Sequence, residues 1–590
     1  MLYSPQNGRV SHAAAPFSQP SRPAQSRKLG LKLKYQRTHR TTISWLTCRP
    51  LNSSSIGTNR GICPSSPNSC SVCTRAVQPA PLGHILRYSE SSMRTRPALH
   101  LLIILALTLA TGVFYIATMR DGHVWGDDFA MYIHHAKNVA SGNAYGDTGY
   151  IYNPHYPDIG PRSYPPLFPL LLAPVYKIVG LHLATMKALN IFLFLVFLLL
   201  FYQLVREDLP LSYIISIVLV LVLNPYIWAL KDQIVSEFLF LLVMCLTFHA
   251  AAAHSERDTL ASAAATAFCI ALCFATRTVG FIFLPCVLLY DLIRSKKLVP
   301  ATLRTAGLAL AFMAPQIIAF SGNGSTSSYA DQLSALSLRA TLHAVRMYAW
   351  IICRELWWNG YSSFPSVLLS AALGSLGLLG YLQRLRSRLS LLEIFMPAYA
   401  FLVVILWSRD QDLRLLIPLV PFWLFYAALG LLELGRFAGG AWERALAPVL
   451  LLLIFGSYAG AYSKTEYGPF TQSLGDTRFM ELCEYIKKET ARDSIFLFAK
   501  PRLLSLLTDR PASGYQDPLK QSELWDYCSE IGVNYIITSD SFDRDRLILK
   551  PFVVAYSDRI DEIYHNTEFQ LYRVQPKSPL AANGIRFQSI

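Results

Sequence analysis

A succession of long apolar runs restricts the fold of this chain more than any other feature. Because a helix needs about 20 apolar residues to cross a bilayer, each run predicts a membrane span. Eleven spans are predicted, and the chain is expected to be an α-helical polytopic membrane protein. They lie near 99–118, 183–203, 211–229, 233–252, 259–276, 278–293, 301–320, 363–382, 391–407, 413–434 and 445–462.

The composition supports a membrane protein and excludes a nucleic-acid-binding one. The chain is 53% hydrophobic and 15% charged, whereas soluble domains average about 25% charged residues. The net charge of +15 is concentrated in residues 1–92, where nine Arg and three Lys face one acid, Glu90. No basic stripe interleaved with aromatic residues follows this segment, so we expect no nucleic-acid partner.

Residues 1–92 are rich in Ser, Pro, Arg and Gln and lack hydrophobic periodicity, so they are not expected to build a core. Met93 is followed by Arg94, Thr95 and Arg96 and then by the first apolar run, as at the start of a first span. The segment 1–92 is therefore interpreted as a mis-called extension upstream of a start at Met93, or otherwise as a disordered tail.

Basic residues in short loops predict the orientation of the spans, because such residues stay in the cytoplasm. Three clusters fall on the side shared with Arg94 and Arg96, which predicts a cytoplasmic N-terminus and an outer C-terminal domain in a bacterial inner membrane. The domains expected are a membrane domain at 93–462, with a first outer loop at 119–182, and a periplasmic domain at 463–590. The clusters are Arg294/Lys296/Lys297, Arg384/Arg386/Arg388 and Arg436/Arg444.

The segment 463–590 predicts a small α/β domain, because helical and strand-like patterns alternate in it. RFMELCEYIKKE and LKQSELWDYCSEIG are expected to be helices, and SIFLFA, VNYIITS, FVVAYS and EFQLYRV are expected to be strands. No glycine-rich phosphate loop follows any of these strands, so the domain is not expected to bind a nucleotide.

The first outer loop carries the strongest candidate for catalysis, the adjacent pair Asp127–Asp128 ahead of the amphipathic stretch FAMYIHHAKNVASG. Acids at a helix start are favoured by the helix dipole and as N-caps, which explains one of them. Two adjoining carboxylates raise each other's pKa, as a general base requires. Tyr132 and Tyr164 are expected to line a pocket beside them; the prolines after Tyr164 set a stiff turn.

A second group of ionisable residues lies at the predicted outer ends of later spans. Ionisable residues at this depth tend to mark a site, although snorkelling explains any one of them equally well. Arginine and lysine on the side of the acidic loop point to an anionic group such as a phosphate. The candidates are Lys231, Arg277, Arg409 and Arg414, with Glu237 as a pocket residue.

Three histidines of the loop, His123, His134 and His135, show no metal-binding spacing. Neighbouring residues of a helix also point in different directions, so a divalent metal is not favoured. We expect no cofactor.

Seven segments of the chain match a known pattern: GDDFAMYIHHAKNVASGNAYGDTGYIYNP, YPPLFPLLLAPVYKIVG, QIVSEFLFLL, ALCFATRTVGFIFLP, DLRLLIPLVPF, FAKPRLLSLLTDRPASGY and GVNYIITS. They resemble the GT-C glycosyltransferases of bacteria, and in particular the protein O-mannosyltransferase-related family that includes the aminoarabinose transferases of lipid A. The resemblance covers roughly 93–462, and the C-terminal segment is similar to the outer domain of many bacterial members.

The resemblance implies transfer of a sugar, with inversion, from a polyprenyl-phosphate donor to a lipid, glycan or protein acceptor on the outer face. It places the base at Asp127 or Asp128, where the family often has Asp-Glu. It makes Lys231, Arg277, Arg409 and Arg414 candidates for the donor phosphate by position. Two other functions stay open, a glycolipid transporter or flippase and a non-catalytic envelope assembly protein.

Overall fold

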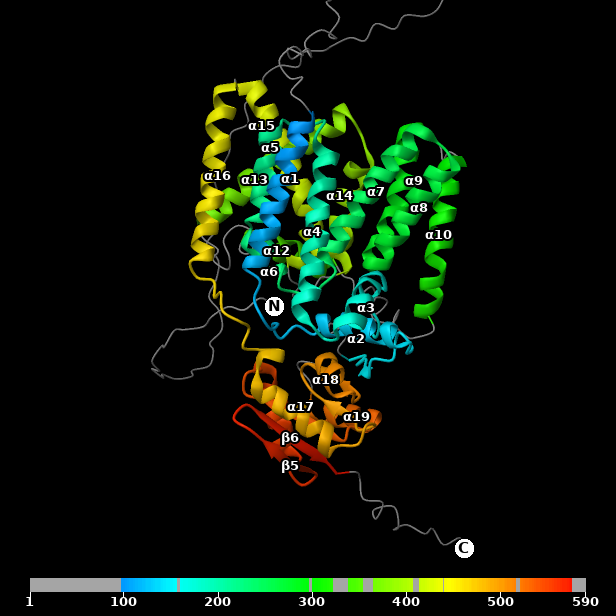
Figure 1. Ribbon diagram of the computed structural model, residues 1–590, viewed down its shortest axis with the longest axis vertical. Coiled ribbons are helices and arrows are strands. Elements are labelled where there is room, and N and C mark those ends of the chain that lie inside the picture. The colour runs from blue at the N-terminus through cyan, green and yellow to red at the C-terminus, as the bar shows by residue number, and fades with distance from the viewer. Residues whose placement is uncertain are drawn as a thin grey trace, which may run out of the picture. The chain divides into compact units, whose positions relative to one another are not determined.

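The structure is a computed structural model, and it describes residues 97–155, 160–296, 300–321, 338–353, 364–406, 413–438, 440–515 and 520–575. The chain from Thr95 onward forms one unit. In this unit the chain up to Tyr462 is mostly helical, with one short strand at Tyr150–Ile151 among its described residues, and the chain after Tyr462 combines helices with strands (Figure 1). The predicted extension 1–92 lies outside the described residues.

Helices form most of the described chain before residue 463. They are α1 (Pro97–Ala117), α2 (Asp128–Ser141), α3 (Leu167–Val179), α4 (Leu183–Val205), α5 (Leu211–Val222), α6 (Pro225–Leu230), α7 (Glu237–Arg257), α8 (Leu260–Thr276), η2 (Thr278–Ile282), α9 (Phe283–Ser295), α10 (Pro300–Ser321), α12 (Leu338–Ile351), α13 (Phe364–Ser387), α14 (Leu391–Leu406), η4 (Leu413–Leu415), η5 (Ile417–Leu419), α15 (Val420–Ala438) and α16 (Gly440–Tyr462).

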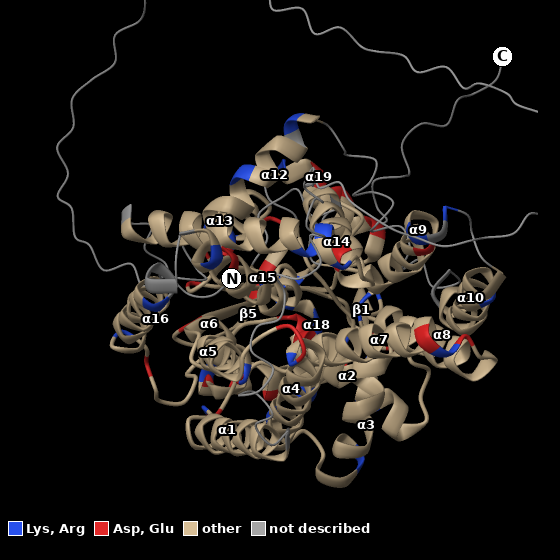
Figure 2. Cartoon of the chain, turned by 90° about the horizontal axis from the view of Figure 1, so that it is seen from above, with Lys and Arg blue, Asp and Glu red and all other residues tan. Residues whose placement is uncertain are grey.

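Seven helices in the described chain are long and apolar enough to cross a membrane: α1, α4, α7, α10, α13, the segment of η5 and α15, and α16. Each coincides with a predicted span. The other four predicted spans coincide with the shorter helices α5, α8, α9 and α14, so the count of eleven remains a prediction. In Figure 2, α1 is tan along its length, and blue and red are confined to short segments of the chain.

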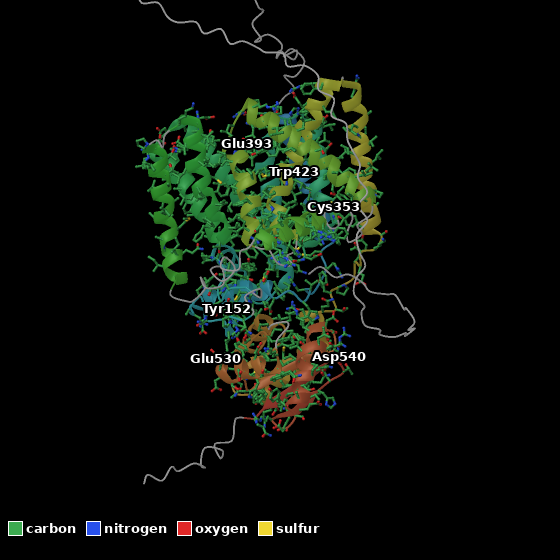
Figure 3. The ribbon with its side chains drawn as sticks, turned by 180° about the vertical axis from the view of Figure 1, so that it is seen from behind. Tyr152, Cys353, Glu393, Trp423, Glu530 and Asp540 are labelled. Carbon is green, nitrogen blue, oxygen red and sulfur yellow. The ribbon has the colours of Figure 1, made fainter. Side chains whose placement is uncertain are left out.

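Close backbone contact holds part of this bundle together. A Cβ at Gly380 of α13 would lie 1.9 Å from the carbonyl oxygen of Tyr426 in α15, so only glycine allows the two helices to approach this far. Next to this contact the Tyr426 hydroxyl donates to Glu393 Oε1 at 2.9 Å. Glu393 also accepts from the backbone N–H of Ser390 and so caps α14. Figure 3 shows Glu393 toward the end of the bundle opposite to Tyr152 of the outer loop.

The predicted outer loop contains two helices. The stretch expected to be an amphipathic helix forms α2, which ends at Gly142 with a left-handed φ of 73°. Residues 129–136 of α2 are buried, mainly against α3 and α18. Pro165 and Pro166 stand just before α3, where their fixed φ suits the entry into a helix.

The C-terminal part contains a six-stranded sheet in the order β1-β3-β2-β4-β6-β5, in which the first four strands are parallel. The strands are β1 (Tyr150–Ile151), β2 (Phe496–Leu497), β3 (Ala512–Ser513), β4 (Tyr535–Ser539), β5 (Ile560–His565) and β6 (Phe569–Val574). The helices are η6 (Ser473–Gly475), α17 (Thr477–Glu489), α18 (Pro501–Thr508), α19 (Gln521–Ile531), η7 (Asp545–Leu549) and α20 (Lys550–Ala555).

Two features of this sheet differ from the prediction. Strand β1 belongs to the outer loop, so the sheet is not built from 463–590 alone. The segment FVVAYS was predicted as a strand, and this was wrong, because it continues the helix α20. Pro551 in the first turn favours a helix start, and Phe552 and Val553 bury their side chains from that helix.

Candidate active site

Asp128 is the first residue of α2 and lies within a network of charged side chains. Its Oδ1 accepts hydrogen bonds from Tyr164 Oη at 2.6 Å and from Arg502 Nη1 at 3.3 Å, and its Oδ2 accepts from Arg414 Nη1 at 3.0 Å. Although burial favours the neutral carboxyl group, Arg414 and Arg502 hold the pKa of Asp128 down to about 2. The side chain is 34% exposed. Asp128 is therefore an ionised carboxylate that a substrate can reach.

Asp127 adjoins Asp128 but has different partners. Its Oδ1 accepts from the backbone N–H of Leu503 at 3.2 Å, and its Oδ2 accepts from that of Arg502 at 3.4 Å. These N–H groups belong to the first turn of α18, so Asp127 caps a helix of the C-terminal part. The side chain is 11% exposed, and burial raises the pKa of Asp127. The two neighbouring pKa values are therefore shifted in opposite directions, upward for Asp127 by burial and downward for Asp128 by Arg414 and Arg502.

Glu237, the first residue of α7, extends the network of Asp128. Its Oε1 accepts from Arg414 Nε at 2.7 Å and lies 2.9 Å from Arg277 Nη1. Arg277 follows the last residue of α8, where the helix dipole favours a cation. Asp128 and Glu237 each stand in the first turn of a helix, where the dipole favours an anion. Helix ends thus position the chain of charges Asp128–Arg414–Glu237–Arg277.

Two tyrosines cover one side of this network. The rings of Tyr132 and Tyr164 lie 4.9 Å apart, and the Tyr132 hydroxyl lies 2.9 Å from Ser236 Oγ. The backbone N–H of Tyr164 donates to His135 Nε2 at 3.2 Å, which fixes the start of the turn before α3. Both predicted pocket tyrosines therefore lie beside Asp128 and Glu237.

Of the remaining two predicted phosphate ligands, the structure describes only Lys231, which lies elsewhere. Lys231 Nζ is 2.6 Å from Asp232 Oδ2 and 3.8 Å from the centre of the Trp228 ring, and both charged side chains are almost fully buried. Within the described part of the chain, Lys231 thus contacts Asp232 and Trp228, and neither belongs to the Asp128 network. Arg409 lies outside the described residues.

Two of the three loop histidines, His123 and His135, are engaged in hydrogen bonds with the protein. His135 Nδ1 lies 2.7 Å from the Tyr145 carbonyl oxygen, and Nε2 accepts from Tyr164, so both ring nitrogens are used. His123 likewise contacts the Val124 carbonyl oxygen and accepts from the Ile234 N–H. Across the ranges that the structure describes, no group of three or more His, Cys, Asp or Glu side chains is placed to hold a metal ion.

Arg502 is a site residue that the sequence did not predict. It comes from α18, about 370 residues after Asp128, and its side chain is 1% exposed. One sequence signal was available: an arginine in the apolar stretch FAKPRLLSLL directly after a predicted strand. A buried arginine in such a stretch needs an anionic partner, which local pattern alone does not identify.

Models of protein families do not match this chain, and curated proteins show no significant sequence similarity to it. Among solved structures, it is similar to ArnT from Cupriavidus metallidurans bound to undecaprenyl phosphate, with 12% identity and a TM-score of 0.51, over 81% of this chain and 98% of that one. The oligosaccharyltransferase of Archaeoglobus fulgidus in complex with zinc and sulfate is less similar, with 12% identity and a TM-score of 0.46, over 74% of this chain and 68% of that one. The similarity to ArnT shows that this chain has the GT-C fold, as the sequence predicted.

Proposed function

We propose that this protein is a membrane glycosyltransferase that moves a sugar from a polyprenyl-phosphate donor to an acceptor, with inversion. The observation that carries the proposal is Asp128, a partly exposed carboxylate held between Arg414 and Arg502 in a protein with the fold of ArnT. The ArnT structure contains undecaprenyl phosphate, which supports a polyprenyl phosphate as the carrier here.

The chemistry uses the network as follows. The Asp128 carboxylate takes the proton of an acceptor hydroxyl, and the acceptor oxygen attacks the anomeric carbon from the face opposite the phosphate. The bond between that carbon and the phosphate oxygen breaks, and its electron pair leaves with the polyprenyl phosphate. Arg414 and Arg277 stabilise the phosphate charge, so no general acid is needed. Arg409 is expected to join them.

Asp128 rather than Asp127 is the proposed base, because the side chain of Asp128 is 34% exposed, whereas that of Asp127 is 11% exposed and caps α18. A donor phosphate that draws Arg414 away removes one of the charges that lower the pKa of Asp128. The carboxylate thereby becomes a stronger base only when the donor is bound. Tyr132 and Tyr164 would line the sugar site beside it.

Glu237 is proposed as a sugar-binding residue in this scheme. Its Oε2 is buried, and no described residue donates a hydrogen bond to it. A buried acceptor of this kind needs a donor, and a sugar hydroxyl supplies one. Since Oε1 already binds Arg414, Glu237 would connect the sugar to the phosphate side of the site.

The placement of the enzyme in the cell follows from the same proposal. Residues 93–462 would form the transferase in a bacterial inner membrane with the N-terminus in the cytoplasm, and 463–590 would lie outside. The acceptor would be a lipid, glycan or protein of the cell envelope. The outer loop and the domain at 463–590 would then meet the donor on the outer face of the membrane.

Purified protein in liposomes tests the function with a labelled polyprenyl-phosphate sugar and an extract of envelope acceptors. Wild type is expected to release polyprenyl phosphate and label an acceptor, and Asp128→Asn is expected to lose about 10²–10⁴-fold in rate. Asp147→Asn is the matched control, since Asp147 is an exposed acid of the same loop. Donor crossing the bilayer unchanged, without sugar release, would instead indicate a flippase and refute the proposal.

A further inference from the structure

Arg502 connects the C-terminal part to the candidate base through several atoms of one guanidinium group. Nη1 lies 3.3 Å from Asp128 Oδ1 and donates to Tyr164 Oη at 2.7 Å. Nη2 donates to the Pro161 carbonyl oxygen at 3.1 Å. The group also lies 4.7 Å and 4.9 Å from the ring centres of Tyr150 and Tyr164. One side chain thus holds the outer loop at four places.

The position of Arg502 in the sheet explains why it reaches the loop. It lies just after β2, at the edge where the parallel strands β1, β3, β2 and β4 end. Open parallel sheets bind ligands at this edge, often an anion at the N-terminus of a helix. Here the first turn of α18 receives the carboxylate of Asp127. The usual ligand edge of the domain is therefore directed at the acids of the outer loop.

Gly160 provides independent evidence that this space is shaped for a guanidinium. Its φ of +100° disfavours other residues, and a Cβ there would lie 2.9 Å from Arg502 Nη2 and 3.1 Å from Tyr164 Oη. Gly142 also has a positive φ, of +73°, but a Cβ there would meet nothing within 4 Å. Only the first glycine is therefore required by Arg502.

We propose that Arg502 is a positioning residue of the transfer reaction, through which the C-terminal domain holds Asp128 and Tyr164 in their working geometry. This inference rests on the proposed function. The domain is then part of the catalytic unit, and not only an accessory that recruits the acceptor. A lysine keeps the charge but lacks the planar set of donors that bridges three groups.

The test measures kcat and the donor KM per folded enzyme in liposomes at pH 7.5 and 5.5. Arg502→Gln is expected to lower kcat roughly 100-fold with little change in KM, because misplacement of a reacting group costs about that much. It also removes a charge that keeps Asp128 ionised, so the ratio of kcat at pH 5.5 to that at pH 7.5 falls. Arg502→Lys is expected to regain part of kcat and the wild-type ratio.

Three further variants keep the test decisive where Arg502→Gln folds poorly. Gly160→Ala displaces the guanidinium without removing it and is expected to lower kcat. Gly142→Ala also adds a Cβ at a positive φ, but no atom within 4 Å would meet it, and it is expected to leave kcat unchanged. Arg510→Gln is the matched arginine control, since buried Arg510 donates to Thr508, Lys487 and Thr490 of its own domain. It is expected to lower stability and to leave the pH ratio unchanged.

The outcomes separate this inference from the function on which it rests. Wild type that transfers no sugar overturns both. The role of Arg502 alone is overturned by a different result. In that case wild type is active and Asp128→Asn is inactive, but Arg502→Gln or Gly160→Ala keeps the wild-type kcat and pH ratio.

Discussion

Two clusters of ionisable residues in this protein contain the same types of side chain but differ in how their charges are satisfied. In the first, Lys231 and Asp232 face each other at 2.6 Å with side chains that are 0% and 1% exposed. The second Asp232 oxygen accepts the Arg120 N–H at 2.9 Å. In the second cluster, Asp128 and Arg414 are 34% and 22% exposed. The first cluster is closed, and the second is open to a ligand.

This difference shows that an ionisable residue near the end of a predicted span serves one of two purposes. A closed pair holds segments together, as Lys187 does nearby by donating to the Arg120 and Gly122 carbonyl oxygens at 2.6 and 2.7 Å. An open network can exchange a protein partner for a substrate group. Sequence position does not separate the two cases, but experiments on each cluster do.

The largest expected effect is on stability in the closed cluster. Lys231→Met leaves the Asp232 carboxylate buried beside an apolar side chain, and loss of one partner of a buried pair costs about 3–5 kcal/mol. Thermal unfolding in detergent measures the change. The double variant Lys231→Met/Asp232→Leu should recover much of the loss, and a single variant as stable as wild type would show that the pair is not closed.

The next effect is on activity and compares the two clusters directly. Arg414→Gln is expected to lower kcat/KM for the donor by roughly 10²–10³, as for removal of one donor to a developing charge. Lys231→Gln, compared per folded enzyme, should stay near wild type. An equal loss in both variants would return Lys231 to the phosphate site that the sequence predicted for it.

A smaller effect depends on pH and concerns His135, which lies in the same outer loop as Asp128. Burial lowers the pKa of His135 to about 3, whereas an unfolded histidine titrates near 6.5. Below about pH 6.5 the unfolded state therefore binds a proton that the folded state refuses, and stability falls by up to about 1.4 kcal/mol per pH unit until the pH nears the folded pKa. Between pH 7.5 and 5, the melting temperature of wild type should therefore fall more steeply than that of His135→Gln. An equal fall in both proteins would contradict the lowered pKa of His135.

The smallest effect separates the two neighbouring aspartates. Asp127→Ala removes the cap of α18, which costs about 1 kcal/mol, and the amides of Arg502 and Leu503 should exchange hydrogen faster. Asp476→Ala removes the cap of α17, which accepts the Arg478 N–H at 3.0 Å, and should leave those two amides unchanged. Unaltered exchange in Asp127→Ala would mean that Asp127 does not cap α18.

Much of the fold was predictable because apolar runs of span length are a strong local signal. All seven long apolar helices in the described chain coincide with predicted spans. The sheet was less predictable, since β1, β2 and β3 have two residues each and show no alternation to detect. The segment FVVAYS has strand-like composition, but Pro551 and the preceding turn of η7 lead it into a helix.

The acidic residues of the candidate site were predictable from the sequence, but its basic residues were predictable only in part. Asp127, Asp128 and Glu237 stand at helix starts, Arg277 follows the end of α8, and Arg414 lies in the short turn η4. Lys231 has the same kind of position, but its neighbour Asp232 satisfies its charge. Arg502 depends on a contact across about 370 residues, which no local pattern records.

The strand β1 has a consequence for how the protein is made. Ser513 of its partner strand β3 is synthesised 362 residues after Ile151 of β1. The Ser513 hydroxyl donates to the Ile151 carbonyl oxygen at 3.0 Å. Since chains emerge from the ribosome N-terminus first, the outer loop waits unpaired until nearly the whole chain has been made. Arg502 also arrives only then. A nascent or prematurely ended chain therefore carries Asp128 without its completed surroundings, and competence is gained in one late step of biogenesis.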